Sequence, residues 1–153
     1  MMNFQNDGKE IPSVGEKCMI YITHILLIMA AIWDIKKMEV PLTISVMLYL
    51  VHTCELLSSN YWKIDFIGMI LCFSIFAFAM IWSNIGGADA LIAGVIGYNL
   101  GLYGLYAIIL ALCICIPYLL YMHVKHKEHD YPFVPFLTVG YFIVYFISEK
   151  AGL

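Results

Sequence analysis

Between Asp65 and Lys125 the sequence contains a single Asp, Glu, Lys or Arg residue, which is Asp89. About 20 apolar residues are enough to cross the hydrocarbon core of a bilayer, so this stretch could cross it more than once. The whole chain is 63% hydrophobic and 12% charged, whereas soluble domains carry about 25% charged residues. Such a chain cannot cover its apolar surface in water. The sequence therefore predicts an integral membrane protein surrounded by a lipid bilayer.

Six apolar runs approach the length of a membrane span. They are Lys17–Trp33, Pro41–Leu57, Ile64–Trp82, Ala90–Tyr106, Leu105–His123 and Pro132–Ser148. Irregular backbone cannot face lipid, so the runs predict an all-α membrane protein, a bundle of about six transmembrane helices. We expect one domain over residues 17–153, preceded by a polar tail at residues 1–16. The fourth and fifth runs meet at Gly101 and Gly104, where a tight reversal is expected, although a five-span reading stays open.

Two aspartates flank these runs. Asp34 follows the first run and Asp89 directly precedes the fourth, so two complete runs lie between them and both should reach the same membrane face. Ionisable residues at membrane depth are costly and are functional candidates. Two close carboxylates share a proton, the arrangement by which aspartic proteases activate water. The alternatives are structural: Asp89 would cap a helix, and Asp34 would pair with Lys37.

Two glycines, Gly86 and Gly87, stand three and two residues before Asp89. Glycine permits unusual dihedrals and lets another backbone come close, as a scissile peptide must. The spacings among Gly94, Gly97 and the glycines that follow also allow close approach of helices.

The histidines do not predict a metal site. His123, His126 and His129 are spaced by three residues and would drift around a helix, so we expect a solvated loop. His24 and His52 lie in apolar runs, where we expect hydrogen-bonded core histidines. We expect neither a metal nor another cofactor.

Three segments carry a family resemblance. They are "DIKKMEVP" at Asp34–Pro41, "GGAD" at Gly86–Asp89 with Gly97 eight residues further on, and "PFVPFLTVG" at Pro132–Gly140. In this order they resemble the signatures of the type IV prepilin peptidases and preflagellin peptidases, which are GxGD-type membrane aspartyl proteases. Ala88 stands where the third motif position is often glycine, and the CxxC pairs of the longer members are absent.

The resemblance implies an aspartic endopeptidase that removes a short basic leader, after a glycine, from prepilin-like or pseudopilin-like proteins. Asp34 and Asp89 would be its catalytic residues. The residues of the active-site loop and its surroundings would be Gly86, Gly87, Ala88, Lys36, Pro132 and Pro135. The short form implies neither a zinc site nor methyltransferase activity.

The resemblance also places the active site at the cytoplasmic face of the cell membrane. The lysines agree, because the aspartate side holds slightly more of them once the N-terminal tail is set aside. The net charge of -3, with no basic run, does not suggest a nucleic-acid partner. Two other functions stay open: a proton-linked transporter subunit, since membrane carboxylates also relay protons, and a non-catalytic membrane assembly protein.

Overall fold

The computed structural model describes residues 14–38, 40–56, 62–82, 86–124 and 132–151. His126 and His129 lie outside these residues. The regular elements in the described ranges are all helical, which confirms the predicted fold class. In chain order they are α1 (Val14–Lys37), α2 (Leu42–Leu56), α3 (Trp62–Trp82), α4 (Gly87–Leu100), the 3-10 turn η1 (Gly101–Tyr103), α5 (Gly104–Val124) and α6 (Val134–Ala151).

Each apolar run of the sequence corresponds to one α-helix, with differences at the ends. Helix α1 begins at Val14, so the end of the predicted polar tail is helical, and it continues beyond Trp33 to Lys37. Asp34 therefore lies in the last turn of α1 and not after it. The predicted reversal occurs at η1, where Gly101 has a φ of 54°. Side chains other than hydrogen rarely tolerate this conformation, so glycine is needed there.

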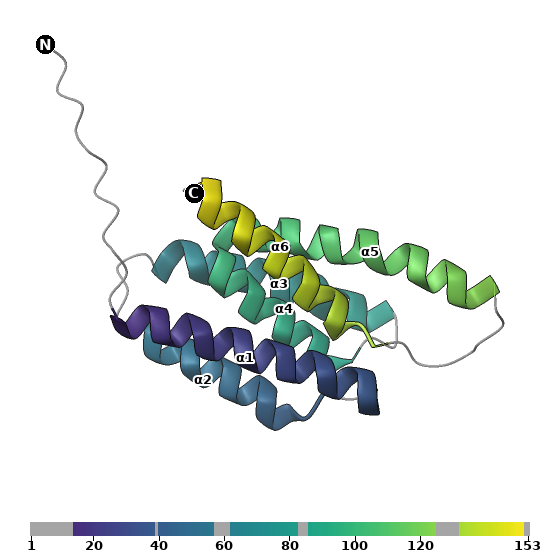
Figure 1. Cartoon of the computed structure of the whole chain (residues 1–153), viewed down its shortest axis with the longest axis horizontal. Coiled ribbons are helices and arrows are strands. Elements are labelled where there is room, and N and C mark those ends of the chain that lie inside the picture. The colour runs from purple at the N-terminus through teal and green to yellow at the C-terminus, as the bar shows by residue number, and fades with distance from the viewer. Residues whose placement is uncertain (1–13, 39, 57–61, 83–85, 125–131, 152–153) are drawn as a thin grey trace, which may run out of the picture.

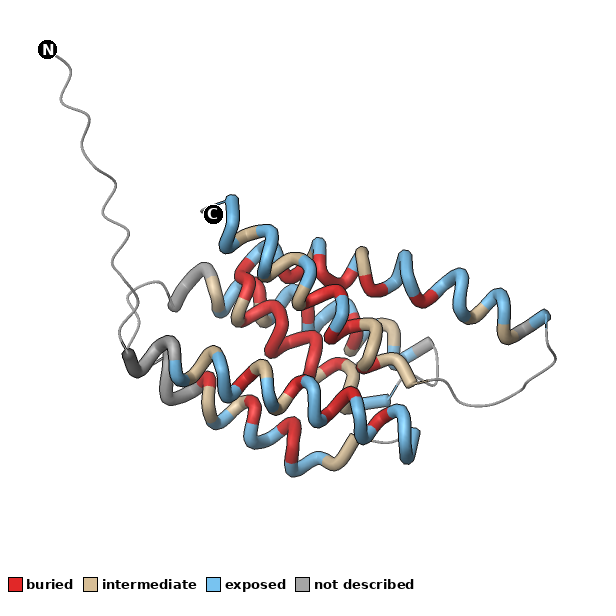
Figure 2. The backbone as a smooth tube through the Cα atoms, viewed as in Figure 1, coloured by how far each residue is buried: buried red, intermediate tan, exposed pale blue. Residues whose placement is uncertain are grey.

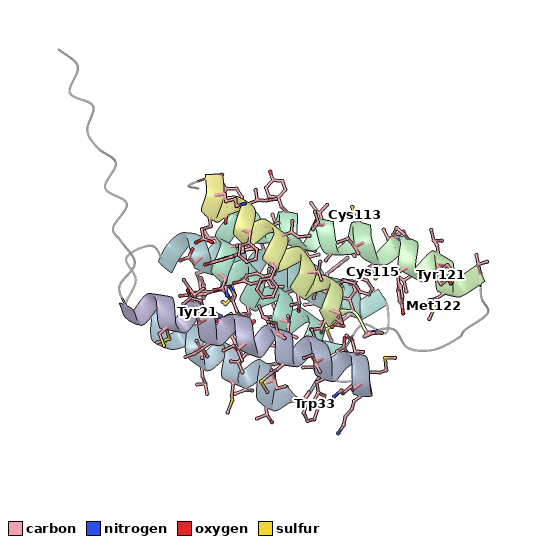
Figure 3. All side chains as sticks on the ribbon, viewed as in Figure 1. Tyr21, Trp33, Cys113, Cys115, Tyr121 and Met122 are labelled. Carbon is pink, nitrogen blue, oxygen red and sulfur yellow. The ribbon has the colours of Figure 1, made fainter. Side chains whose placement is uncertain are left out.

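Three segments are long and apolar enough to cross a membrane. They are Cys18–Lys37, Gly87–Met122 and Val134–Ala151, while Leu42–His52 and Asp65–Ile81 are shorter apolar helices. The second segment turns back at η1 and comprises α4 and α5. Large apolar side chains point outward from the bundle, among them Tyr21 and Tyr121 (Figure 3). These features indicate a multi-pass membrane protein.

The helices pack in three layers (Figure 1). Helices α4 and α6 form the middle layer, with α1 and α2 on one side and α3 and α5 on the other. Most residues of α4 are buried, as Figure 2 shows, so this helix is the centre of the core. The last turns of α1 and α3 lie at the same end of the bundle as the first turns of α2, α4 and α6. We call this end the aspartate end.

Glycines bring α3 and α4 into direct backbone contact. A Cβ on Gly97 would lie 2.7 Å from the carbonyl carbon of Gly68 and 2.8 Å from Cβ of Cys72. A Cβ on Gly104 would lie 2.7 Å from Cα of Gly97. The predicted close approach of helices through glycine is confirmed, and it is the usual way in which membrane helices maximise van der Waals contact. The contact fixes α4, and with it Asp89, against α3.

Polar side chains join four helices in the other half of the bundle. Asn99 Nδ2 lies 3.1 Å from His52 Nε2, and Thr23 Oγ1 lies 3.5 Å from the same nitrogen. His24 Nε2 lies 3.0 Å from the hydroxyl oxygen of Tyr141. Both histidines are therefore hydrogen-bonded within the bundle, as predicted. These contacts fix α1, α2, α4 and α6 relative to one another.

Candidate active site

Asp34 is bound to the start of α6. Its side chain is 6% exposed, and its Oδ2 accepts a hydrogen bond of 3.0 Å from the Val134 backbone N–H. The Phe133 backbone N–H is a second donor to this carboxyl group. The first amides of a helix have no partner within the helix, and an anion there is favoured. Lys37, the partner proposed in the structural alternative, places its Nζ over the Trp33 ring, 4.9 Å from the centroid.

Asp89 occupies the third position of α4. The helix has Gly86 as its N-cap, so Asp89 is not the N-cap itself and that alternative is wrong in this form. The Asp89 N–H donates to the Gly86 carbonyl at 3.1 Å, and the Asp89 carboxyl group accepts a hydrogen bond from the Gly86 N–H. This is the reciprocal half of a capping box, which holds the half-buried carboxyl group close to the helix start.

The two carboxyl groups lie in the same region of the bundle. Helices α1 and α4 face each other across α2 and α6, which contact both of them. The negative charge of Asp34 acts on the Asp89 carboxyl group. The prediction that both aspartates reach one end of the bundle is therefore confirmed (Figure 1). Two interacting carboxyl groups favour a state that shares one proton, and this state can deprotonate a water while supporting a carbonyl oxygen.

The residues before Asp89 leave its surroundings open. Gly86 has φ -67° and ψ 141°, an extended conformation that any residue adopts, and Gly87 has no positive φ. The expectation of unusual dihedrals is wrong, because an N-cap residue takes ordinary extended geometry. Both glycines are exposed and Ala88 is half-buried. A Cβ at Gly86 would lie 3.5 Å from Asp89 Oδ2, so glycine keeps this approach free of side chains.

The remaining predicted residues divide into two groups. Pro132 and Pro135 flank Phe133 and Val134, whose amides reach Asp34, and both prolines are half-buried. Pro135 lies in the first turn of α6, where the missing N–H costs no hydrogen bond, so it favours a helix start at this place. Lys36 is exposed and stands two positions after Asp34. Two positions correspond to about 200° around a helix, so the structure does not bring Lys36 to the carboxyl pair.

Two features of this region were not found from the sequence. One is the Val134 amide, for which the only signal was a helix start beside prolines. The other is Ser45, which is 1% exposed in the second turn of α2. Across the part of the chain that the structure describes, no group of three or more His, Cys, Asp or Glu residues could hold a metal ion.

Comparison with protein-family models, with curated proteins and with solved structures finds no match to this chain.

Proposed function

We propose that this chain is a membrane aspartyl endopeptidase in which Asp34 and Asp89 are the catalytic residues. The observation that carries the proposal is the pairing of these two carboxyl groups at one end of an apolar bundle. The Asp89 side chain is half-buried and that of Asp34 is buried, and each is held by backbone amides of a helix start. A pair of acids placed in this way is typical of proton transfer at a functional site.

The reaction needs only water and one shared proton. One carboxylate takes a proton from water as the oxygen attacks the scissile carbonyl carbon, and the other carboxyl group gives its proton to the carbonyl oxygen. The tetrahedral carbon then releases the amine, which receives a proton from the pair, and the carbonyl re-forms. The amides of Val134 and Gly86 hold the two carboxyl groups in place during these steps.

The substrate class follows from the position of the pair and from the resemblance of the three motifs. The pair lies at helix ends, so a peptide bond just outside the apolar core of the membrane would reach it. Prepilin-like proteins have a short basic leader, a glycine and then an apolar helix that stays in the membrane. We propose cleavage after that glycine, at the cytoplasmic face, by a bundle in which all six helices cross the bilayer.

The test is cleavage of a prepilin-like substrate by the purified chain in lipid vesicles. The substrate carries a basic leader, a glycine and an apolar helix, and the product is identified by N-terminal sequencing. We expect a product that begins directly after the glycine, and much slower cleavage when this glycine is replaced by leucine. A purified chain that leaves the substrate intact, or that cuts it elsewhere, contradicts the proposal.

The shared proton predicts a bell-shaped pH dependence of kcat/KM. At low pH both carboxyl groups are protonated and no base remains, while at high pH both are ionised and no acid remains, so the rate falls on both sides. The measurement is the initial cleavage rate in vesicles across acidic to mildly alkaline pH, with circular dichroism at each pH to show that the helices persist. A rate that rises with pH to a plateau would contradict the shared proton.

A further inference from the structure

The hydroxyl group of Ser45 is buried without a partner. Its side chain is 1% exposed, and among the described residues no hydrogen-bond partner lies within reach of its Oγ. A buried hydroxyl without a hydrogen bond destabilises a fold, and such groups are rare in native proteins. The neighbouring hydroxyl of Thr43 is exposed. Ser45 is therefore the position in this part of α2 where a bound molecule would gain most from a hydrogen bond.

The face of α2 that carries Ser45 points between α1 and α4. His52 stands seven residues after Ser45, which is two turns along the same face of a helix. Its ring nitrogen lies near Thr23 of α1 and Asn99 of α4. Ser45 faces the same two helices about 10 Å nearer the aspartate end.

The packing of α2 on α4 gives the depth of Ser45. Both helices begin at the aspartate end and run in the same direction (Figure 1). The Tyr49 hydroxyl lies against Gly94. One turn back along each helix, Ser45 is level with Ala90, a small buried residue directly after Asp89. The hydroxyl group is thus about one helical turn deeper in the bundle than the carboxyl pair.

We propose that Ser45 binds the backbone of the substrate on the membrane side of the scissile bond. This inference rests on the proposed function. A peptide must be extended to be cut, and its backbone N–H and C=O groups then need partners in a region that holds little water. One helical turn is about 5.4 Å, which an extended chain covers in about two residues. A serine hydroxyl both donates and accepts, so it suits either backbone group.

The experiment compares Ser45→Ala, Ser45→Thr and the matched control Thr43→Ala in vesicles with the prepilin-like substrate. The measured quantities are kcat, KM and the midpoint of thermal unfolding. Ser45→Ala is expected to raise KM roughly 5- to 10-fold, the effect of one lost neutral hydrogen bond, with little change in kcat. Ser45→Thr keeps the hydroxyl group and should keep most of the affinity. Thr43→Ala should match the wild type.

Stability separates this role from a structural one. Ser45→Ala removes an unsatisfied polar group, so its unfolding midpoint should be equal to or above that of the wild type. Ser45→Cys, which is similar in size but a weak hydrogen-bond donor, should show the same rise in KM and serves if the alanine variant does not fold. An unchanged KM in Ser45→Ala overturns this inference alone. A higher KM with a lower midpoint overturns it in favour of a packing role. A wild type that does not cleave overturns the proposed function together with this inference.

Discussion

Replacing either Asp34 or Asp89 by asparagine is expected to reduce substrate cleavage by about 10³-fold or more and to leave the bundle folded. An amide cannot take a proton from water, so either substitution removes half of the acid–base pair. The asparagine oxygen can still accept the hydrogen bond of Val134 at position 34 or of Gly86 at position 89. The substitution therefore separates the chemistry from the capping role of each carboxyl group.

The measurement is the single-turnover cleavage rate of each variant, together with its thermal unfolding midpoint. Asp65→Asn is the matched control, because Asp65 lies in the first turn of α3 at the opposite end of the bundle. It should cleave at the wild-type rate. If cleavage persists in Asp34→Asn or in Asp89→Asn, the carboxyl group concerned is only a helix cap. The chain would then fit a non-catalytic membrane assembly protein.

The largest effect on stability is expected from Gly97→Ala. The added methyl group would meet the backbone of Gly68 and Cβ of Cys72, at 2.7 Å and 2.8 Å respectively, and the backbone on that side cannot rotate away as a side chain can. Overpacking of this kind costs about 1–3 kcal/mol and more where the neighbour is rigid. We expect about 3 kcal/mol of lost stability, measured as unfolding in detergent micelles by a denaturing surfactant.

Gly87→Ala is the matched control for this effect. A Cβ at Gly87 would lie 3.7 Å from Cε of Met80, an ordinary van der Waals distance to the end of a flexible side chain. The variant should unfold within about 0.5 kcal/mol of the wild type, as is usual for exposed positions. Equal stability of Gly97→Ala and Gly87→Ala would show that α3 and α4 do not pack through their backbones.

The helices could be located from the sequence because lipid imposes one strong rule on every span. A run of about 20 apolar residues has few foldings open to it in a bilayer, so composition alone identifies each helix. The helix ends were less accessible. Helix α1 extends to Lys37 because its last turn carries polar residues that hydropathy excludes although they are compatible with a helix. The glycine turn at η1 was predictable, since only glycine takes its positive φ readily.

The site was predictable only as far as the helix count carried it. Counting two runs between Asp34 and Asp89 was enough to place both at one end of the bundle. The count says nothing about which side chains meet, because that depends on how each helix is rotated about its axis. The Val134 amide and the buried face of Ser45 follow from this rotation. The dihedrals of Gly86 were predicted wrongly because a glycine beside an acid has more than one physical explanation.

The hydrogen bond between Asp34 and Val134 also bears on how the protein is made. Its two residues are 100 positions apart, so the ribosome releases Asp34 long before the amide that holds it exists. Until α6 enters the membrane, the Asp34 carboxyl group has neither this donor nor the neighbouring helix that shields it. We expect a growing chain to remain inactive until its last helix is inserted. Proteolysis during synthesis, a hazard for any protease in a crowded membrane, would thus be prevented by the order in which the helices appear.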